Sequence, residues 1–215
     1  MATGPNYRVS FRRRRKGKSD YQLRKALVVS GLPRLVIRGS LKNIVAQLVK
    51  AEIDGDKVIV SAHSGELTKK YGWQGGCGNL SAAYLTGLLC GYKAIGQGFK
   101  ETVLDIGLQY PSKGSRVFAA LKGVLDAGVT VSHDRDKLPS KERIEGQHVV
   151  EYAKQLLSNQ DAYQKRFSEQ LSRGLRPEEL GNHFAHVREK IVSSFKMAEL
   201  PTSVEKESEK TEEEI

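Results

Sequence analysis

Residues 34–60 have the sequence RLVIRGSLKNIVAQLVKAEIDGDKVIV, and this stretch decides the fold. It holds two β-branched runs, 35–37 and 58–60, on either side of the alternating segment 43–49. In that segment successive residues fall on opposite faces, which is the period of a β-strand. The turn Asp54-Gly55-Asp56 places a glycine where positive φ is easily adopted. We therefore expect three strands in an antiparallel meander.

A glycine-rich stretch, residues 64–78, follows the meander and is expected to be a loop. Asn79 or Ser81 then provides a cap for a helix that runs to about Ile95. Beside the large apolar residues of this helix lies a row of small ones, Ala83, Gly87 and Gly91. Small residues lower helix propensity but allow two backbones to approach closely. We expect this row to face the sheet.

A fourth strand is expected over residues 102–107, centred on Val103-Leu104-Asp105-Ile106. Because it follows a helix, its pairing should be parallel. Ser115 is expected to cap the next helix, which Gly128 ends. A strand-rich half followed by helix, strand and helix predicts the α/β class, with a mixed sheet covered by helices.

The last third of the chain is expected to be helical. One helix is predicted over residues 142–157, and a second apolar stripe ends at Gly174. Pro177, followed by two acids, marks the start of a last helix. From Glu199 onward there are seven acids and two lysines, so we expect the tail 198–215 to be disordered.

Positive charge is concentrated at the start of the chain. The first 42 residues hold twelve basic side chains and one acid, Asp20, and carry +11, whereas the whole chain carries +10. Like charges repel one another, so residues 1–31 should form an arm that does not fold alone, although Ser19 could cap a short helix over 20–29. A dense basic arm ahead of a near-neutral body is typical of a protein that binds a phosphate backbone.

The remaining composition excludes several classes of protein. Cys77 and Cys90 are the two cysteines, which is too few for a disulfide framework or a zinc quartet. Cys90 lies in an apolar run and is expected to be a reduced core thiol, which suits a reducing cytoplasm. No apolar run approaches the length of a membrane span, and no apolar stretch follows the basic N-terminus as it would in a signal peptide.

The sequence does not predict a catalytic group, a cofactor or a metal. Gly96-Gln97-Gly98 follows a helix rather than a strand and lacks the third glycine of a dinucleotide site. His183 and His186 could touch one metal, but surface histidines beside the core residue Phe184 are the simpler interpretation. Asp105 is the most interesting acid because it lies in the middle of a strand, and we interpret it as a structural partner for a basic side chain or a backbone amide.

The sequence features typical of RNA binding are stronger than those of any catalytic, cofactor or metal site. Arg12 to Lys16 is a run of five cations, and Tyr7, Phe11 and Tyr21 interleave rings that can stack on bases. Ser115 marks a helix start whose free N–H groups favour phosphate. The residues expected to bind RNA are Arg8, Arg12, Arg13, Arg14, Arg15, Lys16, Lys18, Tyr21, Arg24, Lys25, Arg34, Arg38, Lys42, Lys113, Ser115 and Arg116.

Several segments, in this order and spacing, resemble a known family. They are Leu32-Pro33-Arg34-Leu35-Val36-Ile37-Arg38, Asn43-Ile44-Val45-Ala46-Gln47, Leu104-Asp105-Ile106-Gly107 and Gly114-Ser115-Arg116-Val117-Phe118-Ala119-Ala120-Leu121-Lys122-Gly123. Together they resemble the universal large-subunit ribosomal protein that binds 5S rRNA. The opening Gly4-Pro5-Asn6-Tyr7-Arg8-Val9, with the arginines that follow Phe11, resembles the archaeal and eukaryotic branch.

The resemblance implies a three-layer α/β/α core of ribonuclease H-like architecture, with no catalytic carboxylates, cofactor or enzymatic activity. It also implies a cytoplasmic protein in the central protuberance of the large subunit, which attaches 5S rRNA to 23S rRNA beside neighbouring ribosomal proteins. The expected divisions are a basic arm (1–31), an α/β core (32–131), a helical extension (132–197) and the acidic tail (198–215). Neither a membrane nor a small-molecule substrate is expected as a partner.

Two other functions stay open at this point. A metal-dependent nuclease on a ribonuclease H-like sheet would need several converging carboxylates, whereas the first strand carries Arg34 and Arg38. A general RNA chaperone would use the same charge with little preference among nucleic acids.

Overall fold

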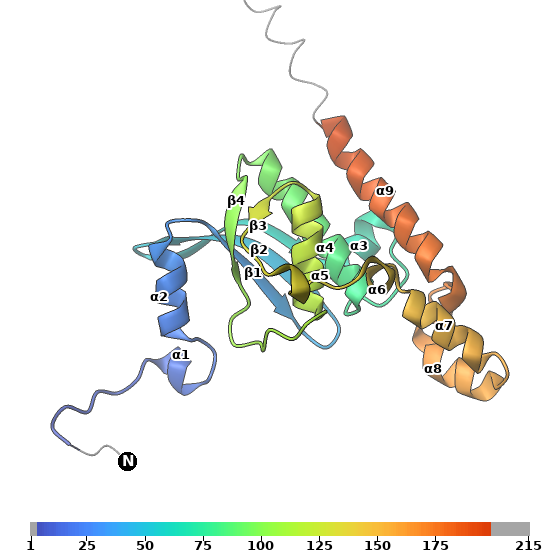
Figure 1. Cartoon of the computed structure of the whole chain (residues 1–215), viewed down its shortest axis with the longest axis horizontal. Helices are drawn as coiled ribbons and strands as arrows, with labels where there is room; N and C mark the ends of the chain where they lie inside the picture. Colours follow the sequence, from blue (N-terminus) through green and yellow to red (C-terminus); the bar gives the residue numbers. More distant parts are fainter. Residues whose placement is uncertain (1–3, 199–215) are drawn as a thin grey trace, which may run out of the picture.

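The structure is a computed structural model that describes residues 4–198 (Figure 1). The predicted acidic tail lies outside the described residues, apart from Ala198. The strands are β1 (Arg34–Gly39), β2 (Ile44–Glu52), β3 (Gly55–His63), β4 (Glu101–Asp105) and β5 (Thr130–Val131). The α-helices are α1 (Arg12–Arg15), α2 (Tyr21–Val29), α3 (Ser64–Tyr71), α4 (Leu80–Gly96), α5 (Arg116–Asp126), α6 (Lys141–Glu145), α7 (Gln147–Leu156), α8 (Gln160–Ser172) and α9 (Leu180–Ala198). Two single 3-10 turns, η1 (Arg135–Lys137) and η2 (Pro177–Glu179), precede α6 and α9.

A mixed sheet with the strand order β3-β2-β1-β4-β5 forms the centre of the body. β1, β2 and β3 pair antiparallel, while β4 pairs parallel with both β1 and β5. The predicted meander and the predicted parallel fourth strand are both confirmed. The parallel pairing is possible because α4 carries the chain back across the sheet between β3 and β4.

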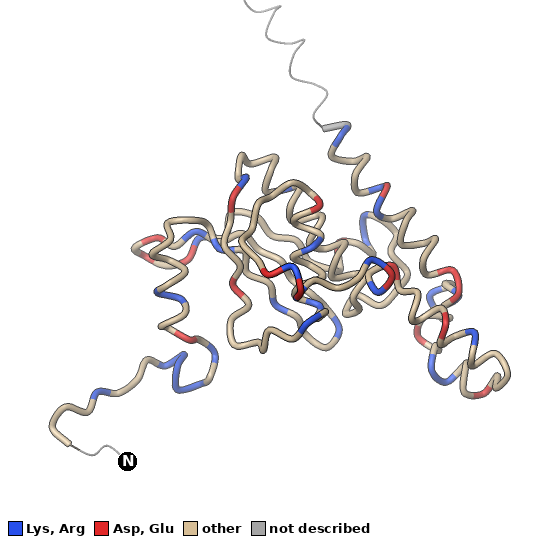
Figure 2. The backbone as a smooth tube through the Cα atoms, viewed as in Figure 1, with Lys and Arg blue, Asp and Glu red and all other residues tan. Residues whose placement is uncertain are grey.

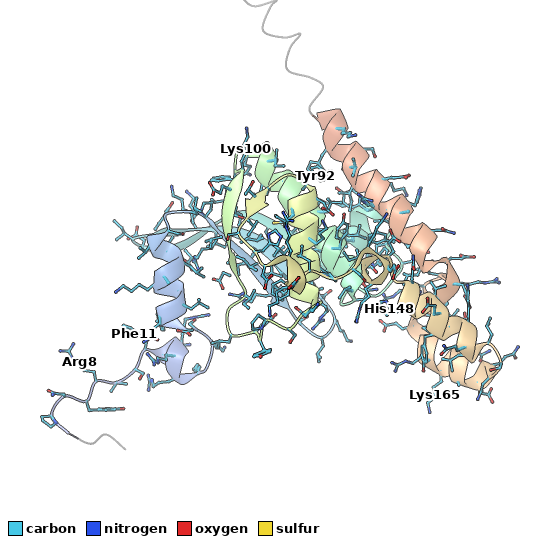
Figure 3. All side chains as sticks on the ribbon, viewed as in Figure 1. Arg8, Phe11, Tyr92, Lys100, His148 and Lys165 are labelled. Atoms are coloured by element: carbon cyan, nitrogen blue, oxygen red, sulfur yellow. The ribbon has the colours of Figure 1, made fainter. Side chains whose placement is uncertain are left out.

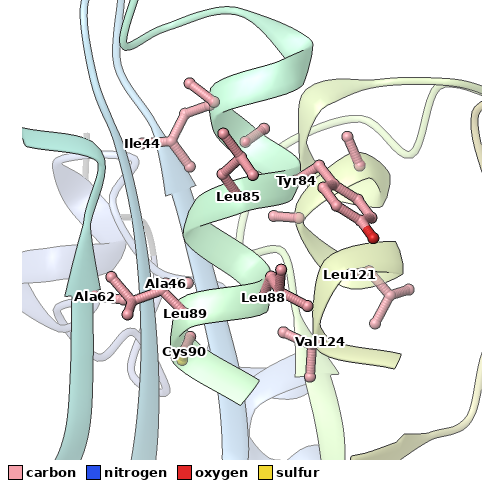
Figure 4. Close-up of a cluster of buried hydrophobic side chains, with 14 of the residues drawn as sticks. Ile44, Ala46, Ala62, Tyr84, Leu85, Leu88, Leu89, Cys90, Leu121 and Val124 are labelled. Carbon is pink, nitrogen blue, oxygen red and sulfur yellow. The ribbon is translucent and has the colours of Figure 1, made fainter. Parts of the chain in front are cut away.

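Helices lie on both sides of this sheet, which confirms the predicted α/β class (Figure 1). α4 packs over β2 and β3, and α5 packs over β1. Figure 4 shows Leu85 and Leu89 of α4 next to Ile44, Ala46 and Ala62 of the strands, all of them buried. α2 lies over the opposite face of the sheet, the face that carries the side chains of alternate β1 residues beginning with Arg34.

The row of small residues on α4 faces α5, so the prediction that it faces the sheet is wrong. A β-carbon on Gly87 would overlap the carbonyl oxygen of Ala120 in α5, and one on Gly123 would overlap the carbonyl oxygen of Tyr84 in α4. Two glycines on facing helices therefore each accommodate the backbone of the other helix. The periodicity of the row predicts close approach, but it does not identify the neighbouring element.

Gly87→Ala is expected to lower the free energy of unfolding by about 3 kcal/mol, because α4 and α5 must separate to admit the methyl group. Urea denaturation measures the loss. Gly96→Ala is the matched control, since no atom lies within 4 Å of its β-carbon position. Alanine has a helix propensity about 0.5–1 kcal/mol better than glycine, so the control should not be destabilised. Equal losses in the two variants would contradict the close-approach explanation.

Two local predictions are also wrong. α3 occupies the first half of the predicted loop 64–78, because His63 accepts a hydrogen bond from the Gly65 N–H and Glu66 accepts one from the His63 N–H. The predicted helix over 142–157 is divided into α6 and α7, because Gly146 has a φ of 85° between them.

The last helix, α9, packs on the body through one apolar stripe. Leu180, Phe184, Val187 and Ile191 are buried, and the ring centroid of Phe184 lies 5.6 Å from that of Tyr84 in α4. None of the helices in residues 4–198 has both the length and the apolar composition that crossing a bilayer needs.

The cysteine of the apolar run lies in this core. Cys90 is a buried free thiol, as predicted, and burial raises its pKa to about 12. A thiol with so high a pKa carries almost no thiolate at neutral pH and is therefore unreactive while the body is folded.

Candidate nucleic-acid interface

The basic arm extends from one side of the body (Figure 2). All of its cations except Arg24 are exposed. α1 consists of four arginines and buries none of its residues. Arg13 Nε donates a hydrogen bond to Ser19 Oγ at 2.9 Å, which holds the turn between α1 and α2. The exposed predicted residues of the arm are Arg8, Arg12, Arg13, Arg14, Arg15, Lys16, Lys18 and Lys25.

Aromatic rings lie beside these cations. The side chain of Phe11 is 69% exposed, and its ring centroid lies 5.0 Å from that of Tyr21. Figure 3 shows Arg8 and Phe11 on the arm, away from the sheet. Exposed rings can stack on bases while neighbouring cations contact phosphates, so this segment is suited to single-stranded or irregular RNA.

The helix of the arm, α2, is capped by Asp20 rather than by Ser19. Asp20 Oδ1 accepts hydrogen bonds from the N–H groups of Gln22 (2.9 Å) and Leu23 (3.3 Å). A carboxylate at this position also interacts favourably with the positive end of the helix dipole. The single acid among the first 42 residues therefore has a local structural role.

The two arginines of β1 converge on Asp105 of β4. Arg34 Nη1 lies 2.9 Å from Asp105 Oδ2, and Arg38 Nη2 lies 3.0 Å from Asp105 Oδ1. Asp105 is thus a partner for basic side chains, as interpreted from the sequence. Only 5% of the Arg34 side chain is exposed, against 44% for Arg38. Arg34 is therefore held inside the body by Asp105, and contact of either arginine with phosphate stays a prediction.

Asp56 links this network to the arm, which the sequence analysis missed. Asp56 Oδ1 accepts a hydrogen bond from Arg24 Nη2 at 2.9 Å and lies 2.7 Å from Arg34 Nη2. The Arg34 contact is an ion pair without a well-directed hydrogen bond. In the sequence Asp56 resembles an ordinary turn residue, because the pattern does not reveal which arginines lie opposite the turn.

Other predicted residues lie near the loops that follow β1 and β4. Arg116 Nη1 donates hydrogen bonds to the carbonyl oxygens of Ser40 and Gly78, both at 2.9 Å, and so holds two loops together. Ser115 occupies the N-cap position of α5, but the expected capping hydrogen bond from its side chain is not formed. The side chains of Lys42 and Lys113 are exposed.

His183 joins α9 to the loop after α3, which the sequence did not reveal. Its Nε2 accepts a hydrogen bond from the Gln74 N–H at 3.1 Å, and its ring stacks on Trp73 with centroids 5.2 Å apart. Burial lowers the pKa of His183, and the nearby His186 and Lys190 lower it further. Residues 4–198 contain no group of three side chains that could hold a metal ion.

Stability is expected to fall on acidification below about pH 6.5, the ordinary pKa of histidine. The pKa of folded His183 is below that value, so the unfolded chain binds more protons in the window between the two pKa values. The contribution of His183 therefore lowers the free energy of unfolding as pH falls through this window, and this contribution is constant at lower pH. Urea denaturation of the wild type and of His183→Gln from pH 7.5 to pH 5 measures the difference. An identical pH dependence in both proteins would contradict this role for His183.

A basic arm with exposed aromatic rings, carried on an α/β body, is typical of a nucleic-acid-binding protein. The sequence profile of the family described as ribosomal large subunit proteins 60S L5 and 50S L18 matches residues 5–101 and 96–134. The chain is similar to "Large ribosomal subunit protein uL18" of Aeropyrum pernix, with 49% identity over 96% of this chain and 97% of the relative. It is 47% identical to the protein of the same name from Caldivirga maquilingensis, over 93% of this chain and 97% of that relative.

The chain belongs to this family of large-subunit ribosomal proteins, and these two relatives confirm its resemblance to the archaeal type. It is accordingly a structural protein of the ribosome and not an enzyme. The nuclease alternative also has no support in the site, because the carboxylate of Asp105 is occupied by two arginines.

Proposed function

We propose that the protein binds 5S rRNA and attaches it to 23S rRNA in the central protuberance of the large subunit. The observation that carries this proposal is the position of the charge. Residues 1–31 hold nine basic side chains and one acid, so the arm carries +8 while the rest of the chain carries +2. Eight of these nine cations are exposed, as are the rings of Tyr7 and Phe11. Such an arm can enter the space between RNA segments while the folded body stays outside.

The divisions proposed from the sequence assign a part to each region. The arm (1–31) contacts phosphates and bases, and the core (32–131) adds Lys42 and Lys113 from its loops. The helical extension (132–197) faces neighbouring ribosomal proteins or RNA in the cytoplasmic ribosome. Neutralising several phosphates releases their counterions, so the affinity falls steeply with salt.

The proposal is tested by filter binding of the purified protein to 5S rRNA, with an excess of tRNA as competitor, over a salt series. Binding to 5S rRNA that resists tRNA at moderate salt supports a dedicated 5S rRNA protein. Equal displacement by tRNA would contradict it and would favour the general RNA chaperone, because charge alone does not distinguish the two RNAs.

A further inference from the structure

The helix of the arm has little apolar packing to hold it against the body. α2 contains no buried residue. Between α2 and the sheet lies a hollow of about 320 Å³, so the apolar side chains Leu23 and Leu27 of α2 line an open space that they share with charged groups such as Arg24. Because hydrophobic stabilisation scales with the apolar area removed from water, the position of α2 depends strongly on its polar contacts.

Asp56 supplies the polar contact between α2 and the sheet. Among the side-chain hydrogen bonds of residues 4–198, the bond from Arg24 to Asp56 is the one that joins α2 to the sheet. Asp56 is itself held by the ion pair with Arg34, a buried side chain whose other terminal nitrogen donates to Asp105. The arm is thereby tied to β1, β3 and β4 through one carboxylate.

We infer that Asp56 is a positioning residue for RNA binding. It docks α2 over the sheet and so sets the direction in which the cations of residues 8–18 leave the body. This inference rests on the proposed function, because it assumes that the arm binds one RNA in one orientation. Asp56 does not touch the RNA in this role, and acts through Arg24.

The inference predicts a change in RNA affinity on removal of Asp56 that is opposite to the change expected from net charge alone. Removing an acid from an RNA-binding protein raises its positive charge, which by itself strengthens binding to any RNA. If Asp56 positions the arm, its removal instead weakens binding to 5S rRNA, because part of the binding free energy is then spent on ordering α2. The affinity for tRNA, which needs no fixed arm direction, should stay the same or rise.

The test compares Asp56→Asn with Asp54→Asn in the full chain. Asp54 lies two residues away in the same hairpin, is exposed, and makes no side-chain hydrogen bond or ion pair within residues 4–198. Both substitutions change the charge equally. Asp56→Asn is expected to bind 5S rRNA about tenfold more weakly than the wild type, and Asp54→Asn no more weakly. Binding by Asp56→Asn as tight as that of the wild type would overturn the inference.

Two further measurements separate positioning from loss of fold and from failure of the proposed function. Amide hydrogen exchange without RNA should be faster in α2 of Asp56→Asn and unchanged in α4, since only the docking is lost. Adding Asp56→Asn to the Arg24→Ala variant should weaken binding little further, because each substitution alone already breaks the contact between Arg24 and Asp56. Additive losses of affinity would contradict the inference. A wild type that tRNA displaces fully would overturn the proposed function instead, while wild-type selectivity with an unchanged Asp56→Asn would overturn only the inference.

Discussion

Changing Arg12, Arg13, Arg14, Arg15 and Lys16 together to glutamine is expected to weaken 5S rRNA binding by about 100-fold to 1000-fold near 0.1 M salt. Each cation that neutralises a phosphate contributes about 0.7–0.9 to the slope of log affinity against log salt. The slope should therefore become shallower by about 3–5 if all five cations contact phosphate. The body should stay folded, because α1 buries none of its residues. Filter binding over a salt series measures both quantities.

A matched control carries five substitutions to glutamine on exposed cations of the helical extension, Lys154, Lys165, Arg166, Arg188 and Lys190. The change in net charge is the same, so the control separates the effect of the arm from that of total charge. We expect a smaller change in slope in the control than in the arm variant. Equal slopes in the two variants would show that the charge acts without regard to its position.

Asp105→Ala is expected to lower the free energy of unfolding by about 3–5 kcal/mol, the usual cost of removing one partner of a buried ion pair. The loss leaves Arg34 in the interior with Asp56 as its remaining carboxylate, and it removes the acceptor for the Gly107 N–H. Urea denaturation measures the change. Asp54→Ala, at an exposed position, should change the stability by less than about 0.5 kcal/mol.

The double variant Arg34→Met with Asp105→Leu tests the cause of this loss. If an unpaired buried charge is responsible, replacing both charges with apolar side chains should recover much of the stability. A double variant as unstable as Asp105→Ala would show that packing around the carboxylate matters more than its charge.

Four of the five strands in residues 4–198 and the pairing among those four could be predicted because their signals are local, whereas the two-residue β5 could not. The β-branched runs and a glycine turn specify an antiparallel meander, and a helix before β4 specifies that this strand pairs in parallel. The surface to which a helix face docks is not local information. The small-residue row was therefore assigned to the sheet, although Gly87 meets α5. Likewise α3 was missed because its cap is a histidine, which is outside the usual set of capping residues.

The site divides in the same way. The run of five cations can be recognised from the sequence alone, and the structure shows that its side chains are exposed. Whether a charged residue is buried cannot be predicted in this way, because its burial depends on partners that are distant in the sequence. Arg34 was predicted to contact RNA from its sign of charge, but two carboxylates from β3 and β4 hold it in the interior. Asp56 was missed for the same reason.

The pairing of Arg34 with Asp105 has a consequence for synthesis of the chain. The two residues are 71 positions apart, so the cationic first strand is made well before the acid that neutralises it. At about 5–20 residues per second, that interval lasts roughly 4–14 s. During this time the nascent polypeptide is a polycation that emerges beside a ribosome covered in phosphates. The unpaired cations of the nascent chain can therefore bind the RNA of the translating particle until their carboxylate partners have been made.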